Sequence, residues 1–267
     1  MTENTKLWGF EEQIHKTLET FNLQIVQMQL QFQQPAASYV AAIDEQFQSI
    51  WSGLNEKVKE AFELTGQALE KAELLGTLGW TLPMNATPGE IVCLIFSIKD
   101  IPSADKAFTN YYMEHNATRL KCLETDLLTS NELQQWRPVL EEAILDLDDS
   151  RYRSCIALLL PLIEGVSAIN FSTPQFHKKT DREKFFLDKL QAERQGSLTE
   201  HIWIWRSFKG FAEVFFKFID FKDPSCKPSL LNRPWILHGR GIPDPNLSDC
   251  LRLLQALDTI SLLSKSR

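Results

Sequence analysis

The chain has 267 residues, of which 43% are hydrophobic, enough to bury the core of one large domain or two modest ones. Its formal net charge of −7 argues against a protein that binds nucleic acid only by unspecific attraction to phosphate. The start of the chain carries no apolar stretch of signal-peptide length, and no later run has the length of a membrane span. The sequence therefore predicts a cytoplasmic protein outside the membrane.

Composition predicts the fold class. Eleven glycines are few for this length, and long segments rich in Leu, Gln, Glu and Lys favour helices, so we predict an all-α fold. The five cysteines are odd in number and widely spaced, which predicts reduced thiols rather than a disulfide framework or a zinc site. The histidines show no metal-ligand spacing, and no glycine-rich nucleotide loop is present, so we expect neither metal nor cofactor.

Two long amphipathic helices are expected at the N-terminus. Apolar residues recur at helical spacing from Lys6 to about Gln33, Pro35 ends this run, and a second helix is expected from Tyr39 to about Leu75. Together they predict an antiparallel helical hairpin. The hairpin could be an arm for assembly or for a protein partner or inhibitor, or it could simply pack on the rest of the fold.

A turn-rich connector follows the predicted hairpin. It is punctuated by Gly76, Gly79, Pro83, Pro88 and Pro102, with a short apolar segment at Ile91–Ile98. Such punctuation marks turns and domain boundaries. We therefore predict an N-terminal helical region over residues 1–100 and a C-terminal helical domain over residues 101–267.

Four features are expected in the C-terminal domain after helix resumes at Asp105. Helices are predicted at Asn131–Asp148 and Arg151–Asn170, and the polar segment Phe171–Gln195 predicts a mobile or weakly helical excursion. Thr199–Lys222 is strongly aromatic and apolar all round, which indicates a central or interface helix. Its rings are expected to pack in the core rather than to stack on nucleic-acid bases, because few polar neighbours accompany them.

Charge is distributed unevenly along the chain. Residues 177–240 carry thirteen Lys/Arg and eight Asp/Glu, a net +5, while the remaining chain has fifteen against twenty-seven, a net −12. A partner that carries phosphate would meet the basic stretch first. The alternative is that these lysines form an ordinary solvated helix face.

One segment, Leu-Leu-Asn-Arg-Pro-Trp-Ile-Leu-His-Gly-Arg at residues 230–240, combines a cation, an imidazole and a helix-start signal. Because proline is favoured at the first helical position, Pro234 predicts Arg233 at the N-cap, with His238 just over one turn inside the helix. Five residues separate their side chains by about 140° in a regular helix. They therefore converge only if Arg233 projects from the terminus.

This segment resembles the Arg-x4-His motif of HEPN ribonucleases, and its Leu-Asn-Arg-x-x-Ile-Leu-His-Gly context is similar to a bacterial branch of that superfamily. In that branch a last long helix follows, as Pro245–Ser264 would here, and Arg151–Gly165 is similar to its first core helix. The resemblance covers about Trp136 to the end of the chain. It implies a HEPN-like helical bundle in the C-terminal half.

The resemblance also implies an activity, namely metal-independent cleavage of RNA in a cleft where two protomers of a homodimer bring their motif helices together. His238 would act as general acid or base, and Arg233 would hold the phosphate. Supporting roles would fall to Asn232, Glu164, Gly239 and Arg240: Asn232 would position the chain or a nucleotide, and Glu164 would orient Arg233 or His238. Gly239 would keep the space beside His238 clear, and Arg240 would add a phosphate contact.

Many relatives of this kind are toxins or effectors in bacterial anti-phage and stress defence. One residue departs from the pattern of active members, because the position after the arginine is usually polar and here it is Pro234, which lacks a backbone N–H. The alternatives are a catalytically inactive HEPN-fold module that binds protein or nucleic acid, or a structural helical scaffold.

Overall fold

A computed structural model of the chain describes residues 67–83, 85–195, 201–220, 222–223, 226–241 and 244–265. Most of the expected N-terminal hairpin lies outside these residues. The chain divides into two compact units, the first comprising residues 1–67 and 88–93, the second residues 68–87 and 94–267. The described residues form helices and turns without any strand, so the predicted all-α class is confirmed.

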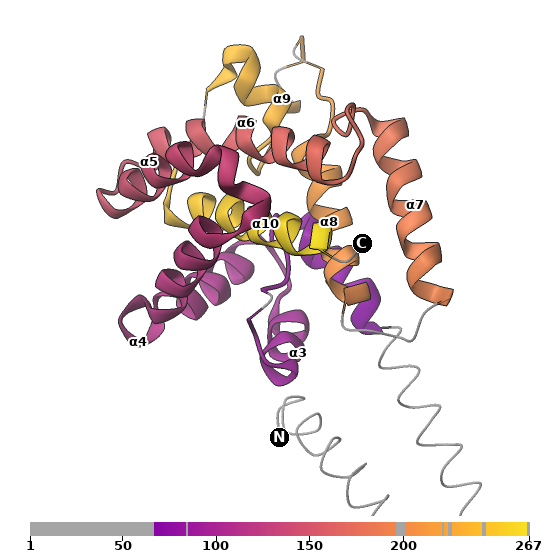
Figure 1. The fold of residues 1–267 in the computed structure, drawn as a ribbon, viewed down its shortest axis with the longest axis horizontal. Helices are drawn as coiled ribbons and strands as arrows, with labels where there is room; N and C mark the ends of the chain where they lie inside the picture. Colours follow the sequence, from indigo (N-terminus) through magenta and orange to yellow (C-terminus); the bar gives the residue numbers. More distant parts are fainter. Residues whose placement is uncertain are drawn as a thin grey trace, which may run out of the picture. The chain divides into compact units, whose positions relative to one another are not determined.

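The described helices follow one another along the chain, with the candidate motif just before the last (Figure 1). A helical segment at 67–77 precedes α3 (Pro88–Ser97), α4 (Ile101–Thr129), the 3-10 helix η1 (Asn131–Trp136), α5 (Arg137–Asp148), α6 (Tyr152–Asn170), α7 (Lys179–Gln195), α8 (His201–Phe215), α9 (Arg233–Trp235), the π-helical turn η3 (Ile236–Arg240) and α10 (Leu247–Lys265). The helices predicted at Arg151–Asn170 and Pro245–Ser264 are confirmed as α6 and α10, with ends that differ by one or two residues. The single helix predicted at Asn131–Asp148 is divided into η1 and α5.

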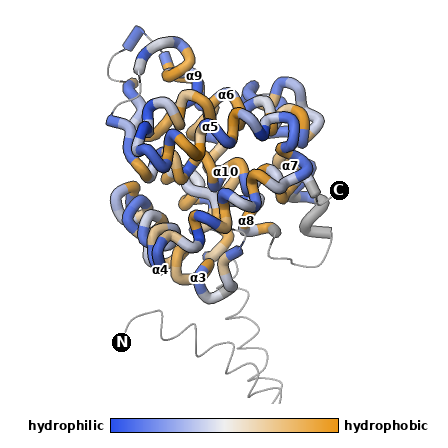
Figure 2. Tube along the Cα trace, turned by 60° about the vertical axis from the view of Figure 1, so that its left-hand side comes forward, coloured by the Kyte–Doolittle hydropathy of each residue, from blue (hydrophilic) through white to orange (hydrophobic). Residues whose placement is uncertain are grey.

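Helix α10 is the central helix of the second unit and packs against α4, α6 and α8. Figure 2 shows its hydrophobic residues among those of the neighbouring helices. Its fully covered apolar residues include Leu251, Leu253, Leu254, Ala256, Leu257 and Ile260. Burial of each leucine or isoleucine contributes roughly 1.5–3 kcal/mol, so this helix organises the core around which the candidate site is built.

Helix α6 supplies the other side of this core and packs on both α5 and α10. Its buried residues include Cys155, Ile156, Leu159, Leu160 and Ile163. Among the described helices, α6 is the one whose length and apolar composition would suffice to cross a membrane. A buried core helix can have the same length and apolar composition, so these two properties do not identify α6 as a membrane span.

The segment Phe171–Gln195 is expected from its sequence to be a mobile or weakly helical excursion, and most of it forms the regular helix α7. Its polar sequence contains four phenylalanines that are buried in one aromatic cluster with α8: Phe171, Phe176, Phe185 and Phe186. From α8 the cluster includes Trp205 and Phe208, so the aromatic residues of this helix pack in the core as predicted. The cluster anchors α7 although the average polarity of the segment is high.

Helix 67–77 crosses α8 at two glycines. A Cβ atom on Gly210 would overlap the Glu73 carbonyl oxygen, and one on Gly76 would overlap the Ser207 carbonyl oxygen. Beside this crossing, the Glu73 carboxylate accepts from Arg206 at 2.6 Å and also pairs with Lys209. Each of the three charged side chains is about a quarter exposed.

Glu73 makes the stability of this crossing dependent on pH. Burial alone would raise the pKa of Glu73, but hydrogen bonds and positive charge from Lys209 and Arg206 outweigh it and hold the pKa below the ordinary 4.5. A lowered carboxyl pKa stabilises the fold above about pH 4.5 and loses that contribution as the pH falls. We expect Glu73→Gln to lower the free energy of unfolding by about 1–2 kcal/mol at pH 7, with the difference shrinking below pH 4.5.

Urea unfolding of the wild type and of the Glu73→Gln variant, from about pH 3 to about pH 8, measures this difference in the free energy of unfolding. Glu183→Gln is the matched control, because Glu183 pairs with Lys179 on the exposed surface of α7, and it should have almost no effect. A Glu73→Gln deficit that stays constant across the acid range would show that the carboxylate charge is not its cause.

Candidate active site

Asn232 begins the short helix that carries the motif. Its Oδ1 accepts a hydrogen bond from the Trp235 backbone N–H at 3.0 Å, and its own backbone is extended, with φ −126°. The prediction that Arg233 is the N-cap is therefore wrong by one residue. The reason is that an asparagine side chain can accept from the first free N–H groups of a helix, which a guanidinium cannot do.

Asn232 also ties this helix to the end of α8. Its Nδ2 donates to the Val214 carbonyl at 3.0 Å and to the Lys217 carbonyl at 2.9 Å. The residue is only 2% exposed, so its amide is occupied by the chain itself. Of the two roles considered for Asn232, positioning of the chain matches these contacts, whereas a contact with a nucleotide has no free surface.

The helix ends where His238 and Gly239 leave helical geometry. Its three α-helical residues continue as a π-helical turn, in which His238 has φ −86° and ψ 18° and Gly239 has φ +74°. His238 lies exposed on this turn. A Cβ on Gly239 would meet no atom within 4 Å, so the glycine is required by its positive φ rather than by a need to clear space.

Glu164 holds Arg233. The Glu164 carboxylate projects from α6, where one oxygen pairs with the Arg233 guanidinium and the other lies 3.2 Å from Nδ1 of His177. The side chains of Glu164 and Arg233 are each 22% exposed, so their ion pair is only partly screened by water. The sequence left open whether Glu164 would orient Arg233 or His238, and the structure pairs it with Arg233.

The sequence did not indicate His177 as a site residue, because it lies in the segment expected to be a mobile or weakly helical excursion. Its loop is held by the nearly buried Arg182, which donates to the Phe176 carbonyl at 3.3 Å and to the His177 carbonyl at 3.0 Å. The Arg182 guanidinium also lies 5.5 Å from the centroid of the Phe216 ring, and burial lowers its pKa. The phenylalanines on both sides of His177 were the signal in the sequence that this loop is anchored.

Arg240 lies on the same turn as His238. Its guanidinium is 5.9 Å from the centroid of the Trp235 ring, a cation–π distance, and the residue is exposed. The second turn of the motif therefore carries an exposed cation and an exposed imidazole, while Arg233 in the first turn is held against α6. An imidazole can transfer a proton near neutral pH, and a guanidinium can bind a phosphate oxygen.

Within the described ranges, no group of three or more His, Cys, Asp or Glu side chains is arranged to hold a metal ion. No family model, curated protein or solved structure matches the chain. Function is therefore inferred from the residues of the motif and from the contacts that hold them.

Proposed function

We propose that the protein is a metal-independent RNA endonuclease of the HEPN type, with His238 as general acid or base and Arg233 as the phosphate-binding cation. The observation that supports this most is the way the Arg-x4-His segment is held. Asn232 anchors its first turn with three hydrogen bonds, Glu164 pairs with Arg233, and His238 remains exposed. Anchoring of this kind is what a site needs in order to align reacting groups.

In the proposed reaction the imidazole transfers protons and the arginines neutralise charge. His238 takes the proton from a ribose 2′-hydroxyl, whose oxygen attacks the adjacent phosphorus while the bond to the 5′-oxygen breaks. An imidazolium returns a proton to that leaving oxygen, so a cyclic phosphate and a 5′-hydroxyl result. Arg233 neutralises the negative charge that develops on the phosphate, and Arg240 adds a second cation at the edge of the site.

Each chain offers one copy of the motif, whereas the cleft of this family combines two. The proposed enzyme is therefore a two-fold homodimer whose motif helices face one another, built on a HEPN-like bundle. The N-terminal arm would serve assembly or bind a protein inhibitor. Such an enzyme would work in the cytoplasm as an effector of bacterial anti-phage or stress defence.

The proposal predicts cleavage of RNA by the purified chain in the presence of EDTA. The products should carry 2′,3′-cyclic phosphate or 3′-phosphate ends, which a phosphatase and ligation assay distinguishes from 5′-phosphate products. Sedimentation of the same sample should show a dimer. Cleavage that stops with chelator, or that leaves 5′-phosphate and 3′-hydroxyl ends, would contradict the proposed mechanism.

The second candidate function is a catalytically inactive HEPN-fold module that binds protein or nucleic acid. Two observations favour it. The Arg233 guanidinium is already paired with Glu164, and its Nε is buried without a hydrogen bond to the described residues. Pro234 also removes a polar side chain and a backbone N–H next to the arginine.

Glu164→Gln separates these two functions. If Glu164 orients Arg233 for catalysis, the substitution should slow cleavage roughly 10- to 100-fold, because a small misplacement of a positioned group costs about this much. His177→Gln should slow cleavage by a smaller factor, since it acts through Glu164. In an inactive module, Glu164→Gln should instead tighten binding of RNA without any cleavage, because the arginine charge is released.

The measurement is single-turnover cleavage of one labelled RNA, together with its binding constant. Glu183→Gln on the exposed face of α7 is the control and should leave both quantities unchanged. Faster cleavage by Glu164→Gln would show that the carboxylate restrains the site rather than positions it.

A further inference from the structure

The second unit has a cavity of about 410 Å³ that the proposed function does not use. It lies between the two limbs of α4, the connector before α3 and the C-terminal part of α10. Its walls include Pro83, Tyr111, Tyr112, Arg119, Asp126 and Asp258. Cavities of this size commonly hold small molecules whose apolar body is covered and whose polar groups meet a few side chains.

A sharp reversal of α4 forms this cavity. Glu114 is extended, and His115, Asn116 and Ala117 all have φ between 52° and 58°, so the helix consists of two limbs joined by a left-handed turn. Arg119 bridges the limbs, because its guanidinium lies 4.3 Å from the centroid of the Tyr111 ring and donates to the Tyr111 carbonyl at 3.3 Å. The cavity is therefore a built part of the fold.

Tyr112 contributes a polar side chain to the lining of the cavity. The residue is 2% exposed, lines the cavity, and makes no hydrogen bond to the described part of the chain. Burial and the nearby charge of Asp258 raise the pKa of Tyr112 well above its ordinary value, so the phenol stays neutral. The Tyr112 oxygen is not among the described polar atoms that are buried without a partner, so water in the cavity can reach it. An occupant with a hydrogen-bonding group can take the place of that water.

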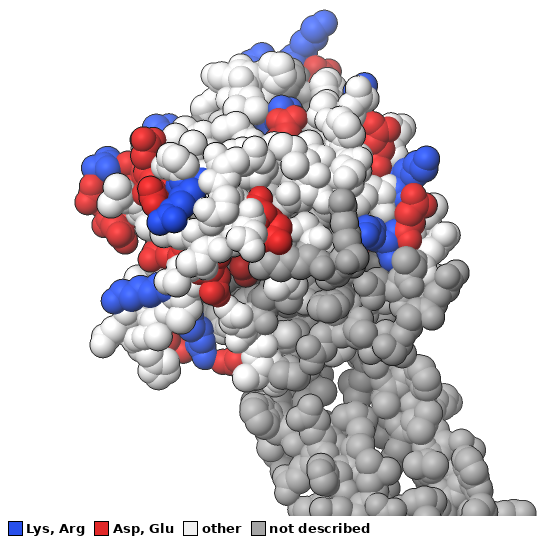
Figure 3. All heavy atoms as spheres, viewed as in Figure 1, with Lys and Arg blue, Asp and Glu red and all other residues white. Residues whose placement is uncertain are grey.

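The charges around the cavity favour a cationic occupant. Its walls carry two carboxylates, Asp126 and Asp258, against the single guanidinium of Arg119, which also lies 3.9 Å from Glu114. Asp126 already accepts from the Asn85 side chain at 2.7 Å. Over residues 101–148 the sequence has nine Asp/Glu and four Lys/Arg, and acidic side chains gather at the left of Figure 3, where Figure 1 places α4 and α5.

We propose that this cavity binds a small organic cation, an amine attached to an apolar body. The ammonium group donates hydrogen bonds to the Tyr112 hydroxyl oxygen and to the Asp258 carboxylate. The apolar body packs against Pro83, Leu123 and the tyrosine rings, which line the same space. This inference is independent of the proposed cleavage of RNA, since none of these residues belongs to the Arg-x4-His site.

Two pairs of probes test the proposal on the full chain by calorimetry. Tryptamine and indole-3-acetate share a ring and differ in the sign of their charge, as do phenethylamine and 3-phenylpropionate. At least one amine should bind saturably, and neither acid should bind at the same concentration. Tyr112→Phe and Asp258→Asn should each weaken amine binding by about tenfold or more, the loss expected for a charge-assisted hydrogen bond.

Asp188→Asn, at an exposed position on α7, is the matched control and should not change binding. Tyr112→Phe removes one oxygen atom and keeps the ring, so the variant should retain the wild-type helical circular dichroism and Tm. The proposal is overturned if no amine binds at millimolar concentration, if amines and acids bind equally, or if both variants bind like the wild type.

Discussion

Replacing His238 with asparagine is expected to slow RNA cleavage by about 10²- to 10⁴-fold, the usual contribution of a general acid or base. His238 is the histidine of the Arg-x4-His motif and lies exposed on its π-helical turn, so the substitution should leave the fold intact. The measurement is single-turnover cleavage of a labelled RNA in EDTA. Thermal unfolding of the same samples checks that stability is unchanged.

The control for this substitution is His115→Asn. His115 is also exposed but lies on the left-handed turn of α4, where φ is +52° and asparagine is readily accommodated. This variant should cleave like the wild type. A His238→Asn protein that cleaves at the full rate would remove His238 from the reaction and leave the inactive binding module as the better account.

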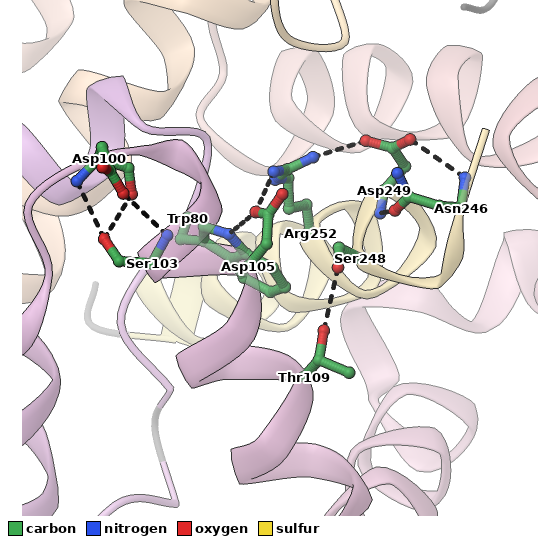
Figure 4. A network of polar contacts seen from close by, with 9 residues as sticks. All are labelled: Trp80, Asp100, Ser103, Asp105, Thr109, Asn246, Ser248, Asp249 and Arg252. Carbon is green, nitrogen blue, oxygen red and sulfur yellow. Dashed lines mark hydrogen bonds and ion pairs between the residues drawn. The ribbon is translucent and has the colours of Figure 1, made fainter. Parts of the chain in front are cut away.

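The largest expected loss of stability comes from disrupting the ion pairs of Arg252. This arginine is only 3% exposed and pairs with Asp105 and, at 2.5 Å, with Asp249 (Figure 4). Trp80 donates from Nε1 to the Asp105 carboxylate at 3.0 Å, and its ring lies 5.3 Å from the guanidinium. The network joins the connector before α3, the start of α4 and the start of α10 into one body.

Asp105→Ala should lower the free energy of unfolding by about 3–5 kcal/mol, because it leaves a buried guanidinium with half of its counter-charge. The remaining carboxylate, Asp249, cannot compensate fully, since burial raises its pKa and it also caps α10 by accepting from the Asn246 N–H at 3.2 Å. Urea unfolding at neutral pH measures the loss.

Glu141→Ala is the control for Asp105→Ala. Glu141 pairs with Arg137 one turn away on the exposed face of α5, and its loss should cost about 0.5 kcal/mol or less. If Asp105→Ala lowers the free energy of unfolding no more than this control does, the Arg252 network does not contribute appreciably to stability.

Helices with continuous apolar periodicity could be predicted from the sequence. In α6 and α10 each apolar residue is followed three or four positions later by another, so the pattern indicates both the helix and its buried face. Helix α7 was expected only as one of two alternatives, mobile or weakly helical, because the average polarity of the segment hides Phe185 and Phe186, which are buried and anchor it. The average polarity of a segment predicts how much of its surface faces solvent. It does not predict where the segment packs, which a few large aromatic rings can determine.

The contacts of the candidate site were harder to predict, because they join residues that are far apart in the chain. Glu164 was proposed from its position inside an apolar helix, but its pairing with both Arg233 and His177 depends on how α6, the loop after it and α9 fold together. The Arg252 network was not anticipated for the same reason. Nothing in the sequence around Trp80 and Asp105 indicates that both lie beside a buried arginine in the folded protein.

The double role of Asn232 has a mechanical consequence for the motif. Its Nδ2 donates to two carbonyls at the end of α8 while its Oδ1 caps the first turn of α9, so a movement of the motif segment away from α8 must break both Nδ2 hydrogen bonds. Asn232 therefore couples the position of Arg233 directly to the end of α8. Asn232→Asp would keep the acceptor and lose both donors, so it would release the motif from α8 while leaving the start of its own helix capped.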